Sequence, residues 1–418
     1  MAKEIFYTAV DIGTSKVCSI VARVGTEGEL KVLGTGIAPS QGVQKGRIES
    51  IGEVREAVAA SLEEAQRYIG RGGISGVYVV LSGTHISCLN TKDTMKDAGK
   101  DAGDLEGVTT QQLHQLIQSS YPQVDPSQEV LHVIPIGYEV DGLSGVRNPA
   151  GLHANEVQIQ SHVVLGDKVT VKNTVKAVEA SKVSVNSLVV HSLASAEAVL
   201  TGDEREMGVV LADIGCGTTD VAIFRYGNPW YSAVLPVGGS QLTRDLAVAL
   251  RTPYHLAEEI KIKWGHVVPD MIRADEEMVI PAFQGQPRRV VKRRALCEPL
   301  HLRMVEILKL IMLRVSQAGL RQLPTGGLII TGGSAEMAGL RELVENTLGG
   351  PVRIAYPSGI AGLPSQLRKP GFSAGVGALL WGIKHQGESR TYRNGERTLW
   401  GYKSLVRRLS RAKEKVSR

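Results

Sequence analysis

Two short segments of this chain carry the same pattern, although about 200 residues separate them. Residues 8–21 read TAVDIGTSKVCSIV, and residues 208–224 read GVVLADIGCGTTDVAIF. In both, an apolar run leads into Asp-Ile-Gly, small and hydroxyl residues follow, and a second apolar run closes the segment. This pattern predicts a strand, a tight turn and a second strand. Such a duplication predicts two like halves, each offering one hairpin to a shared cleft.

The chemistry of the two turns suits a phosphate. Successive backbone N–H groups in a turn form a concave nest that binds anions, and Asp213 would hold the accompanying cation through water. A glycine-rich hairpin on its own is more often only a hairpin. The second copy of the turn is what favours phosphate binding over that plain structural alternative.

The composition bounds the class of protein. At 418 residues the chain is long enough for several domains, and 43% apolar with 22% charged residues is typical of a soluble globular protein. The N-terminus has no continuous apolar run, and no stretch of about 18 apolar residues occurs, so neither a signal peptide nor a membrane span is expected. Four cysteines without the paired spacing of a zinc or redox site indicate a reducing cytosol. They are Cys18, Cys88, Cys216 and Cys297.

The net charge of +6 belongs to the C-terminal tail alone. Residues 396–418 contain eight Lys or Arg and two Glu, which accounts for the whole excess. The rest of the chain is therefore neutral. A protein whose folded body binds nucleic acid would carry a basic face on the fold itself, so we expect no nucleic-acid partner.

The first half of the chain predicts regular elements interrupted by an insertion. Residues 50–68 predict a helix that Ser50 caps, and residues 76–82 predict a buried strand. Between about residues 84 and 163 the composition becomes polar and glycine-rich before a short helix and a strand. Pro135 in that strand suits a sheet edge or a bulge. We interpret this region as a small inserted domain.

The second half of the chain predicts a turn that suits a flat ligand. Residues 328–330 predict a strand that ends at Thr331-Gly332-Gly333-Ser334, and residues 337–348 predict the helix that follows. Two adjacent glycines let the backbone approach a planar group closely, which places an adenine-binding turn here. Residues 297–320 predict a long helix before it.

Taken in order, these pieces match the superfamily of actin, the seventy-kilodalton heat-shock chaperones and sugar kinases. Within it, the chain resembles the FtsA family over essentially its whole length. The segments that carry the resemblance are AVDIGTSKV (9–17), LHVIPIGYEVDG (131–142), RNPAGLHANEVQIQSHVV (147–164), SLASAEAVL (192–200), ADIGCGTTD (212–220), AEEIKIKWG (257–265) and ITGGSAEMAG (330–339). The turns are moderately specific, whereas the motifs of the insertion are much more so.

The resemblance implies an α/β, actin-like (ribonuclease H-like) two-lobed ATPase fold. It also implies an inserted 1C subdomain of the FtsA type and a C-terminal amphipathic helix. The implied boundaries are 1–83 and 165–206 for subdomain 1A, 84–164 for 1C, 207–245 and 326–385 for 2A, 246–325 for 2B, 386–398 for a flexible linker and 399–418 for a membrane-targeting helix.

The resemblance also implies ATP with Mg²⁺ in the cleft and assigns the nucleotide-binding residues. The phosphate-binding residues are Asp11, Gly13, Thr14, Ser15 and Lys16 in the first turn, Asp213, Gly215, Gly217, Thr218 and Thr219 in the second, and the nearby Gly238 and Gly239. Residues around the ribose and adenine are Glu258, Lys261, Gly332, Gly333 and Ser334. Asp11 and Asp213 would hold Mg²⁺ through water. Each assignment has an ordinary structural alternative. The turns would be solvated surface hairpins, Glu258 and Lys261 would form an exposed helical ion pair, and Gly332 to Ser334 would only pack at the start of a helix.

Catalysis is the least defined part of the resemblance. Relatives that hydrolyse ATP place an acid or amide in the helix between the two turns, where it orients the attacking water. Glu197 is the only candidate here, and it falls about one turn late. The expectation is therefore slow or conditional hydrolysis, with assembly set by nucleotide binding rather than by turnover.

The tail predicts a helix that lies on an anionic membrane surface. At 100° per residue, one face is apolar and the other is basic. The membrane-binding residues are Leu399, Tyr402, Lys403, Leu405, Val406, Arg407, Arg408, Leu409, Arg411 and Lys415. The apolar face has no Phe and Trp400 lies off it, so anchoring would depend on charge and on several tails in one polymer. A helix docked on a partner, or a disordered tail, is the alternative.

The function implied by the resemblance is an actin-like protein that forms filaments at the division site. It would bind the C-terminal tail of FtsZ, anchor FtsZ to the inner face of the cytoplasmic membrane, and contact other division proteins through subdomain 1C. A pilus-assembly adapter of the PilM type is the closest rival. A metabolic kinase or exopolyphosphatase would need a substrate base in the cleft, and a chaperone would need a peptide-binding domain after the second lobe.

Overall fold

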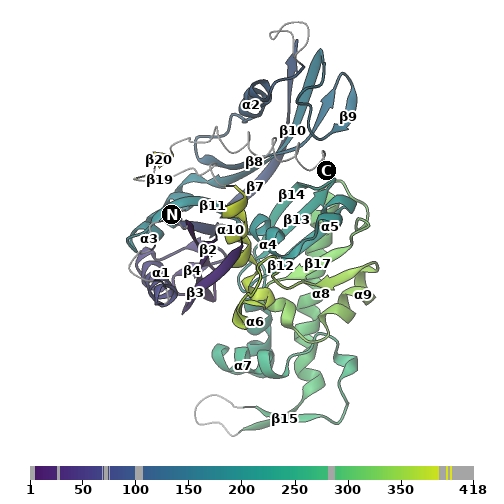
Figure 1. The fold of residues 1–418 in the computed structure, drawn as a ribbon. Helices are drawn as coiled ribbons and strands as arrows, with labels where there is room; N and C mark the ends of the chain where they lie inside the picture. The colour runs from purple at the N-terminus through teal and green to yellow at the C-terminus, as the bar shows by residue number, and fades with distance from the viewer. Residues whose placement is uncertain are drawn as a thin grey trace.

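The computed structural model describes residues 5–25, 29–67, 69, 74, 76–98, 107–280, 288–385, 392–393 and 396–397. Two five-stranded sheets form its two lobes, and a third, four-stranded sheet stands above them (Figure 1). The buried apolar residues form two groups: one surrounds the first sheet and extends to one face of the second through Val209, Leu211 and Phe224, and the other fills the rest of the second lobe.

The two five-stranded sheets have the same topology. The first has the order β11-β6-β1-β2-β3, and the second has the order β14-β13-β12-β17-β18. Each begins with an antiparallel meander of three strands and adds two parallel strands beside the first of them. The strands are β1 (Ile5–Ile12), β2 (Lys16–Val24), β3 (Leu30–Pro39), β6 (Gly76–Leu81) and β11 (Ser184–Val190), then β12 (Val209–Ile214), β13 (Thr219–Arg225), β14 (Asn228–Leu235), β17 (Leu328–Thr331) and β18 (Val352–Ile354).

The repeat extends to the register of the two hairpins. Asp11 lies opposite Cys18 in the first, and Asp213 lies opposite Asp220 in the second. The same backbone hydrogen bond closes each turn, from Gly13 N–H to the Lys16 carbonyl at 3.0 Å and from Gly215 N–H to the Thr218 carbonyl at 2.9 Å. The duplication that the sequence predicted is therefore confirmed at the level of individual residues.

The inserted domain is a four-stranded antiparallel sheet with one helix and its own small core. Its elements are β7 (Ile86–Lys96), α2 (Thr110–Ser119), β8 (Gln128–Val140), β9 (Leu143–Val146) and β10 (Glu156–Asp167). β8 lies inside the sheet, between β10 and β9, and the pairing of β10 skips Ile136, so Pro135 sits beside a bulge rather than at an edge. The polar strand β7 was not predicted, because most of its side chains remain partly or fully exposed.

Helices of the first lobe cover its sheet. They are α1 (Ile51–Gln66), α3 (Lys168–Glu179), α4 (His191–Val199) and α10 (Ser373–Lys384). Of these, α4 also packs against β12 and β13 of the second sheet, so it lies between the two lobes. Ser50 caps α1 as predicted, by accepting a hydrogen bond from Glu53 N–H. α10 packs against β1, β2 and β6 of the first sheet, although residues 326–385 were predicted to lie in the second lobe. Its Gly377 makes this possible, since a Cβ there would lie only 1.7 Å from the Ala194 carbonyl oxygen of α4.

The second lobe carries α8, the longest helix of the described residues, and a hairpin at its far end (Figure 1). Its elements beyond the sheet are α5 (Gly202–Met207), α6 (Gly239–Leu250), α7 (Tyr254–Trp264), β15 (Glu277–Ile280), β16 (Arg289–Lys292), α8 (Arg293–Gln317) and α9 (Leu340–Leu348). The helix predicted from residue 337 begins at Leu340 instead, because Gly339 before it has a φ of +79°.

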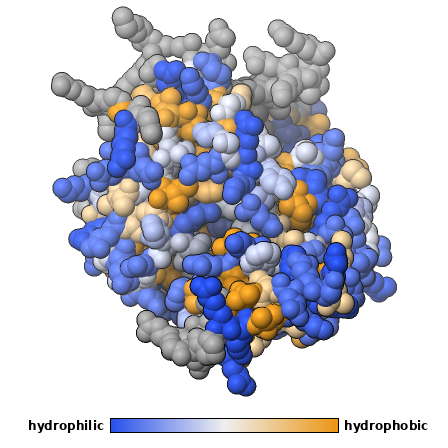
Figure 2. Space-filling model, turned by 90° about the horizontal axis from the view of Figure 1, so that it is seen from below, coloured by the Kyte–Doolittle hydropathy of each residue, from blue (hydrophilic) through white to orange (hydrophobic). Residues whose placement is uncertain are grey.

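Figure 2 views the molecule from this end and shows a mainly hydrophilic surface broken by separate apolar patches. Exposed apolar side chains of the second lobe include Ile262, Met271, Val279, Val290 and Leu302. None of the helices in the described part of the chain is long and apolar enough to cross a membrane.

The predicted membrane helix at 399–418 lies outside the described residues. Within the range 386–398 that was predicted to be a linker, β19 (Tyr392–Arg393) pairs with β20 (Glu396–Arg397) and lies near β11.

Candidate functional site

A cavity of about 420 Å³ lies between the two lobes, and both Asp-Ile-Gly turns line it. It brings together thirteen of the seventeen residues predicted to bind a nucleotide. These are Asp11, Gly13, Thr14, Ser15, Lys16, Asp213, Gly215, Gly239, Glu258, Lys261, Gly332, Gly333 and Ser334. A second cavity, of about 440 Å³, lies between the inserted domain and the second lobe, and none of the predicted nucleotide residues lines it.

The four remaining residues do not line the cavity: Gly217, Thr218 and Thr219 belong to the second turn, and Gly238 packs against it. Gly217 lets the turns approach each other, because a Cβ there would lie 2.5 Å from Thr14 Oγ1. Thr218 Oγ1 donates to Asp220 at 3.0 Å, and Thr219 Oγ1 donates to the Val237 carbonyl at 2.8 Å. A Cβ on Gly238 would lie 2.6 Å from the Gly215 carbonyl oxygen, so only glycine fits there without displacement of the turn.

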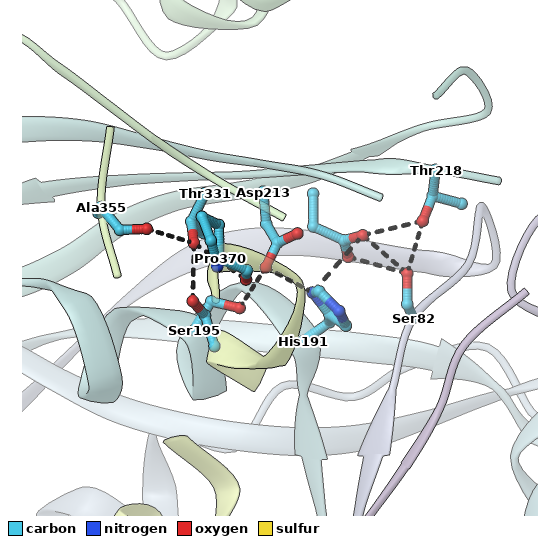
Figure 3. Close-up of polar contacts among 10 residues, drawn as sticks. Ser82, His191, Ser195, Asp213, Thr218, Thr331, Ala355 and Pro370 are labelled. Carbon is cyan, nitrogen blue, oxygen red and sulfur yellow. Dashed lines mark hydrogen bonds and ion pairs between the residues drawn. The ribbon is translucent and has the colours of Figure 1, made fainter. Parts of the chain in front are cut away.

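A buried network of acids and hydroxyls joins the lobes beneath the cavity (Figure 3). Ser195 Oγ in α4 donates to Asp213 Oδ2 at 2.6 Å. Ser82 Oγ, which follows β6, donates to the carboxylate of Asp220 at 2.8 Å. Both hydroxyls belong to the first lobe and both acids to the second. The floor of the cleft is therefore also the connection between the lobes.

His191 lies in this network and lines the cavity. Its Nδ1 is 3.7 Å from Asp213 Oδ2 and 3.8 Å from Asp220 Oδ2. Burial acts to lower the pKa of His191, but the neighbouring carboxylates of Asp213, Asp220 and Asp11 raise it to about 9. Burial raises the pKa of both Asp11 and Asp220, and His191 opposes that effect. The three carboxylates therefore favour the protonated form of the His191 imidazole.

The sequence reasoning missed His191 and selected Glu197 instead. Glu197 does not line the cavity: its carboxylate pairs with Arg205 at 3.3 Å and with Lys384 at 2.9 Å. Those two cations outweigh burial and lower the pKa of Glu197. Its neighbours are therefore those of a structural ion pair. The position of His191 directly after the buried strand β11 was the available signal, because the carboxyl ends of parallel strands border the clefts of such sheets.

The side of the cavity predicted to hold the ribose and adenine has a buried cation at its centre. Lys261 is 8% exposed, and its Nζ donates to Glu258 at 2.7 Å, to Thr243 Oγ1 at 2.8 Å and to the Gly239 carbonyl at 3.2 Å. This geometry differs from an exposed helical pair. Further cations that the sequence did not indicate, Lys263 and Arg293, also line the cavity.

Lys16 is held in place by an aromatic ring. Its Nζ lies 3.8 Å from the centre of the Phe372 ring, in a cation–π contact. Phe372 comes from the segment just before α10. Gly371 of that segment and Ala374 of α10 also line the cavity. The ammonium group is therefore fixed beside the first turn rather than free in solvent.

Two carboxylates, Asp11 and Asp213, lie at the cavity. Within the residues that the structure describes, no group of three or more His, Cys, Asp or Glu side chains is arranged to hold a metal. Asp11 and Asp213 are 8% and 3% exposed and both line the cavity. One carboxylate from each turn thus faces the cavity, and hard carboxylate oxygens are ligands that fit hydrated Mg²⁺.

Comparisons with known proteins agree with this geometry. A profile of the family "Cell division protein FtsA" matches residues 210–377, and one for the "SHS2 domain inserted in FTSA" matches residues 83–165. Among solved structures, the PilM–PilN type IV pilus biogenesis complex aligns with a TM-score of 0.63 at 16% identity, over 90% of this chain and 98% of the other. The ethanolamine utilization protein EutJ of Carboxydothermus hydrogenoformans aligns with a TM-score of 0.50 at 16% identity, over 90% of both chains. These likenesses concern the fold alone.

Two relatives decide the family. The cell division protein FtsA of Pseudomonas aeruginosa is 35% identical over 381 residues, which are 91% of this chain and 89% of the relative. That of Escherichia coli strain K12 is 34% identical over 381 residues and 89% of each chain. The predicted actin-like fold and its inserted domain are therefore confirmed, and the PilM alternative is reduced to a likeness of fold. The chain belongs to the FtsA family of actin-like cell-division proteins.

Proposed function

We propose that this chain binds ATP with Mg²⁺ in the cavity between its lobes, and that bound ATP sets the conformation in which it assembles. The observation that carries the proposal is the convergence of two equivalent turns, one from each lobe, on a single cavity. The buried Lys261 and the turn at Gly332 and Gly333 line the part of that cavity suited to adenosine.

The residues of the cavity have separable roles in this proposal. Backbone N–H groups of both turns and the hydroxyls of Thr14 and Ser15 would hold the phosphates, and Lys16 would neutralise their charge. Asp11 and Asp213 would hold hydrated Mg²⁺, which shields the phosphate oxygens from one another. Lys261 and Glu258 would hold the ribose and adenine.

Turnover is the smaller part of the proposed function. Glu197, the acid expected to orient water, is engaged by Arg205 and Lys384 away from the cavity. We therefore expect ATP hydrolysis far below about 10 per second, the median for enzymes. A nucleotide that touches both turns would instead fix the angle between the lobes, since it would bridge them at the same floor as Ser195 and Ser82.

At the level of the cell, the proposed assembly takes place on the inner face of the cytoplasmic membrane at the division site. Filaments of this chain would bind anionic lipid through residues 399–418 and would anchor FtsZ by its C-terminal tail. The inserted domain would contact other division proteins. Family membership supports this part of the proposal, and each contact needs its own test.

The decisive experiment is sedimentation of the full chain with vesicles that contain anionic lipid. With ATP and Mg²⁺ we expect the protein to pellet with the vesicles as polymer and to carry an FtsZ C-terminal peptide with it. ADP or the absence of nucleotide should reduce the pelleted fraction several-fold. Equal pelleting without nucleotide would contradict the ATP-dependent part, and failure to retain the peptide would contradict the FtsZ part.

A further inference from the structure

A buried histidine of the inserted domain, His132, contacts the first lobe at the start of α4. His132 in β8 is 8% exposed, and its Nε2 accepts a hydrogen bond from Val190 N–H at 3.2 Å. Val190 is the last residue of β11 and the N-cap of α4, and its own side chain does not cap the helix. An imidazole from another domain therefore occupies the position where a capping group would act.

The helix that His132 contacts leads directly into the cavity. His191, the next residue after Val190, lines the cavity, and Ser195 one turn further donates to Asp213 at 2.6 Å. A shift at the N-cap would move both side chains, because the backbone of a helix moves as a unit. Only one peptide unit thus separates the inserted domain from a residue of the cleft.

A second contact of His132 reaches the cavity through α10. Trp381 meets the His132 ring edge-on, with the ring centres 5.2 Å apart, and stacks on His385 at 4.0 Å. Trp381 belongs to α10, whose Ala374 lines the cavity and whose Gly377 packs directly against α4. His132 therefore touches both helices of one closely packed pair, and each helix contributes a residue to the cleft.

We propose that His132 is a positioning residue for the nucleotide cleft, through which the inserted domain holds the start of α4 and sets Ser195 and His191 against Asp213. The inference rests on the proposed binding of ATP. Because coupling between two sites is reciprocal, a partner that displaces β8 would change the affinity for ATP, and ATP would change the affinity for that partner by the same factor.

Two variants of His132 test the inference in the full chain. Binding of ATP with Mg²⁺ is measured by displacement of a fluorescent ATP analogue. His132→Ala leaves Val190 N–H without this acceptor, and we expect affinity to fall roughly fivefold or more, the lower end of typical coupling between sites. His132→Gln keeps a carbonyl oxygen near the position of Nε2, so it should recover most of the affinity. The amide of Val190 should exchange hydrogen faster in the alanine variant than in the glutamine variant.

A matched control is His162→Ala. His162 is also a buried histidine of the inserted domain, but its partners are Asn90 and Ser232, away from the cavity. This variant should lose stability while its ATP affinity stays within about twofold of the parent chain. The inference is overturned if both alanine variants lose affinity equally, if His132→Ala binds ATP like the parent, or if His132→Gln fails to recover. Failure of the parent chain itself to bind ATP would instead contradict the proposed function.

Discussion

Gly332 and Gly333 are adjacent, yet a side chain would meet very different surroundings at the two positions. Gly332 has a φ of +88°, and a Cβ on it would lie 2.4 Å from Asp213 Oδ1. A Cβ on Gly333 would meet nothing within 4 Å. We expect Gly332→Ala to lower the free energy of unfolding by about 2 kcal/mol or more, because it combines a strained backbone with a clash.

Gly333→Ala is the matched comparison, and it separates folding from binding. Its urea midpoint should equal that of the parent chain, whereas its affinity for ATP should fall severalfold, because the open space around Gly333 is where the adenine would lie. If Gly333→Ala binds ATP with the affinity of the parent chain, the adenine does not lie at this turn. Equal urea midpoints for both variants would contradict the expected strain at Gly332.

The alkylation rate of Cys216 can report whether a nucleotide occupies the cavity, without an assay of activity. This cysteine lies in the second turn, lines the cavity and is half-buried, whereas Cys18 and Cys297 are buried. Burial raises the pKa of the Cys216 thiol, so alkylation is best followed at alkaline pH, where the reactive thiolate forms. ATP with Mg²⁺ should slow its alkylation about tenfold at saturating nucleotide, since roughly nine-tenths or more of the chain would then be occupied.

The reagent is iodoacetamide, and peptide mass spectrometry measures the rate at each cysteine. Cys88 is also half-buried but lies near Ser232, outside the cavity, so it serves as the internal control. Protection of Cys88 to the same degree would indicate a general change in the fold. Absence of protection at Cys216 under saturating ATP would argue against phosphates in the second turn.

At the residue scale, the sequence predicted the turns well because their chemistry and their backbone geometry coincide. Asp-Ile-Gly followed by hydroxyls specifies a tight turn, which the structure confirms in both places, and anion binding by these turns stays a prediction. His191 lacked such a local pattern: its role depends on Asp213 and Asp220, which reach it only through the packing of one lobe on the other. Glu197 was selected for its carboxylate, and only the fold shows that this carboxylate forms ion pairs with Arg205 and Lys384.

At the scale of elements, prediction succeeded where apolar periodicity was strong and failed where packing decided. The helix α1 and its Ser50 cap follow from sequence alone. The strand β7 was not predicted, because its many exposed polar residues obscure the alternation of apolar and polar side chains. The helix α10 was assigned to the wrong lobe. α10 is apolar on nearly every side, so periodicity could not tell which core it enters, whereas the close approach of Gly377 to α4 does.

The inserted sheet should weaken at acid pH because it buries a neutral histidine. His162 in β10 is fully buried between Asn90 and Ser232, and burial lowers its pKa to about 4. The unfolded chain binds this proton at higher pH than the folded chain does. Stability is therefore lost as pH falls from the unfolded pKa of 6.5 towards 4, by up to about 1.4 kcal/mol per pH unit.

The test compares urea unfolding of the parent chain and of His162→Asn at pH 7 and pH 5. The parent should lose about 2 kcal/mol more than the variant between the two pH values, since asparagine does not titrate. Other titrating groups contribute equally to both proteins and cancel. An identical loss in the two proteins would show that His162 is not the group responsible.

At the scale of the whole molecule, the inserted domain belongs to the first lobe by chain order but is bonded to both lobes. His132 holds α4 of the first, while His162 contacts Ser232 and Asn90 donates to the Trp230 carbonyl in β14 of the second. The lobes are thus joined at two levels, by hydroxyl–acid pairs beneath the cavity and by the inserted sheet above. Of these contacts, the one made by His132 lies next to His191, a residue that lines the cavity.

The last prediction concerns residues 399–418, whose removal tests whether membrane attachment depends on the tail or on the folded body. A chain that ends at residue 398 loses seven of the eight basic residues in 396–418. Each is worth about 1 kcal/mol near an anionic surface, so this chain should no longer pellet with vesicles of that composition. It should still bind ATP with the affinity of the full chain, since every lining residue of the cavity lies before position 375.

Charge and apolar contact can be distinguished within the tail. A full-length variant with Leu405, Val406 and Leu409 replaced by Ser keeps all basic groups but loses much of the apolar face. If the tail is an interfacial helix, this variant should bind anionic vesicles more weakly than the parent and should be released by salt, because only screened charge attraction remains. Unchanged binding of the chain that ends at residue 398 would remove the membrane role from the tail and assign it to the folded body.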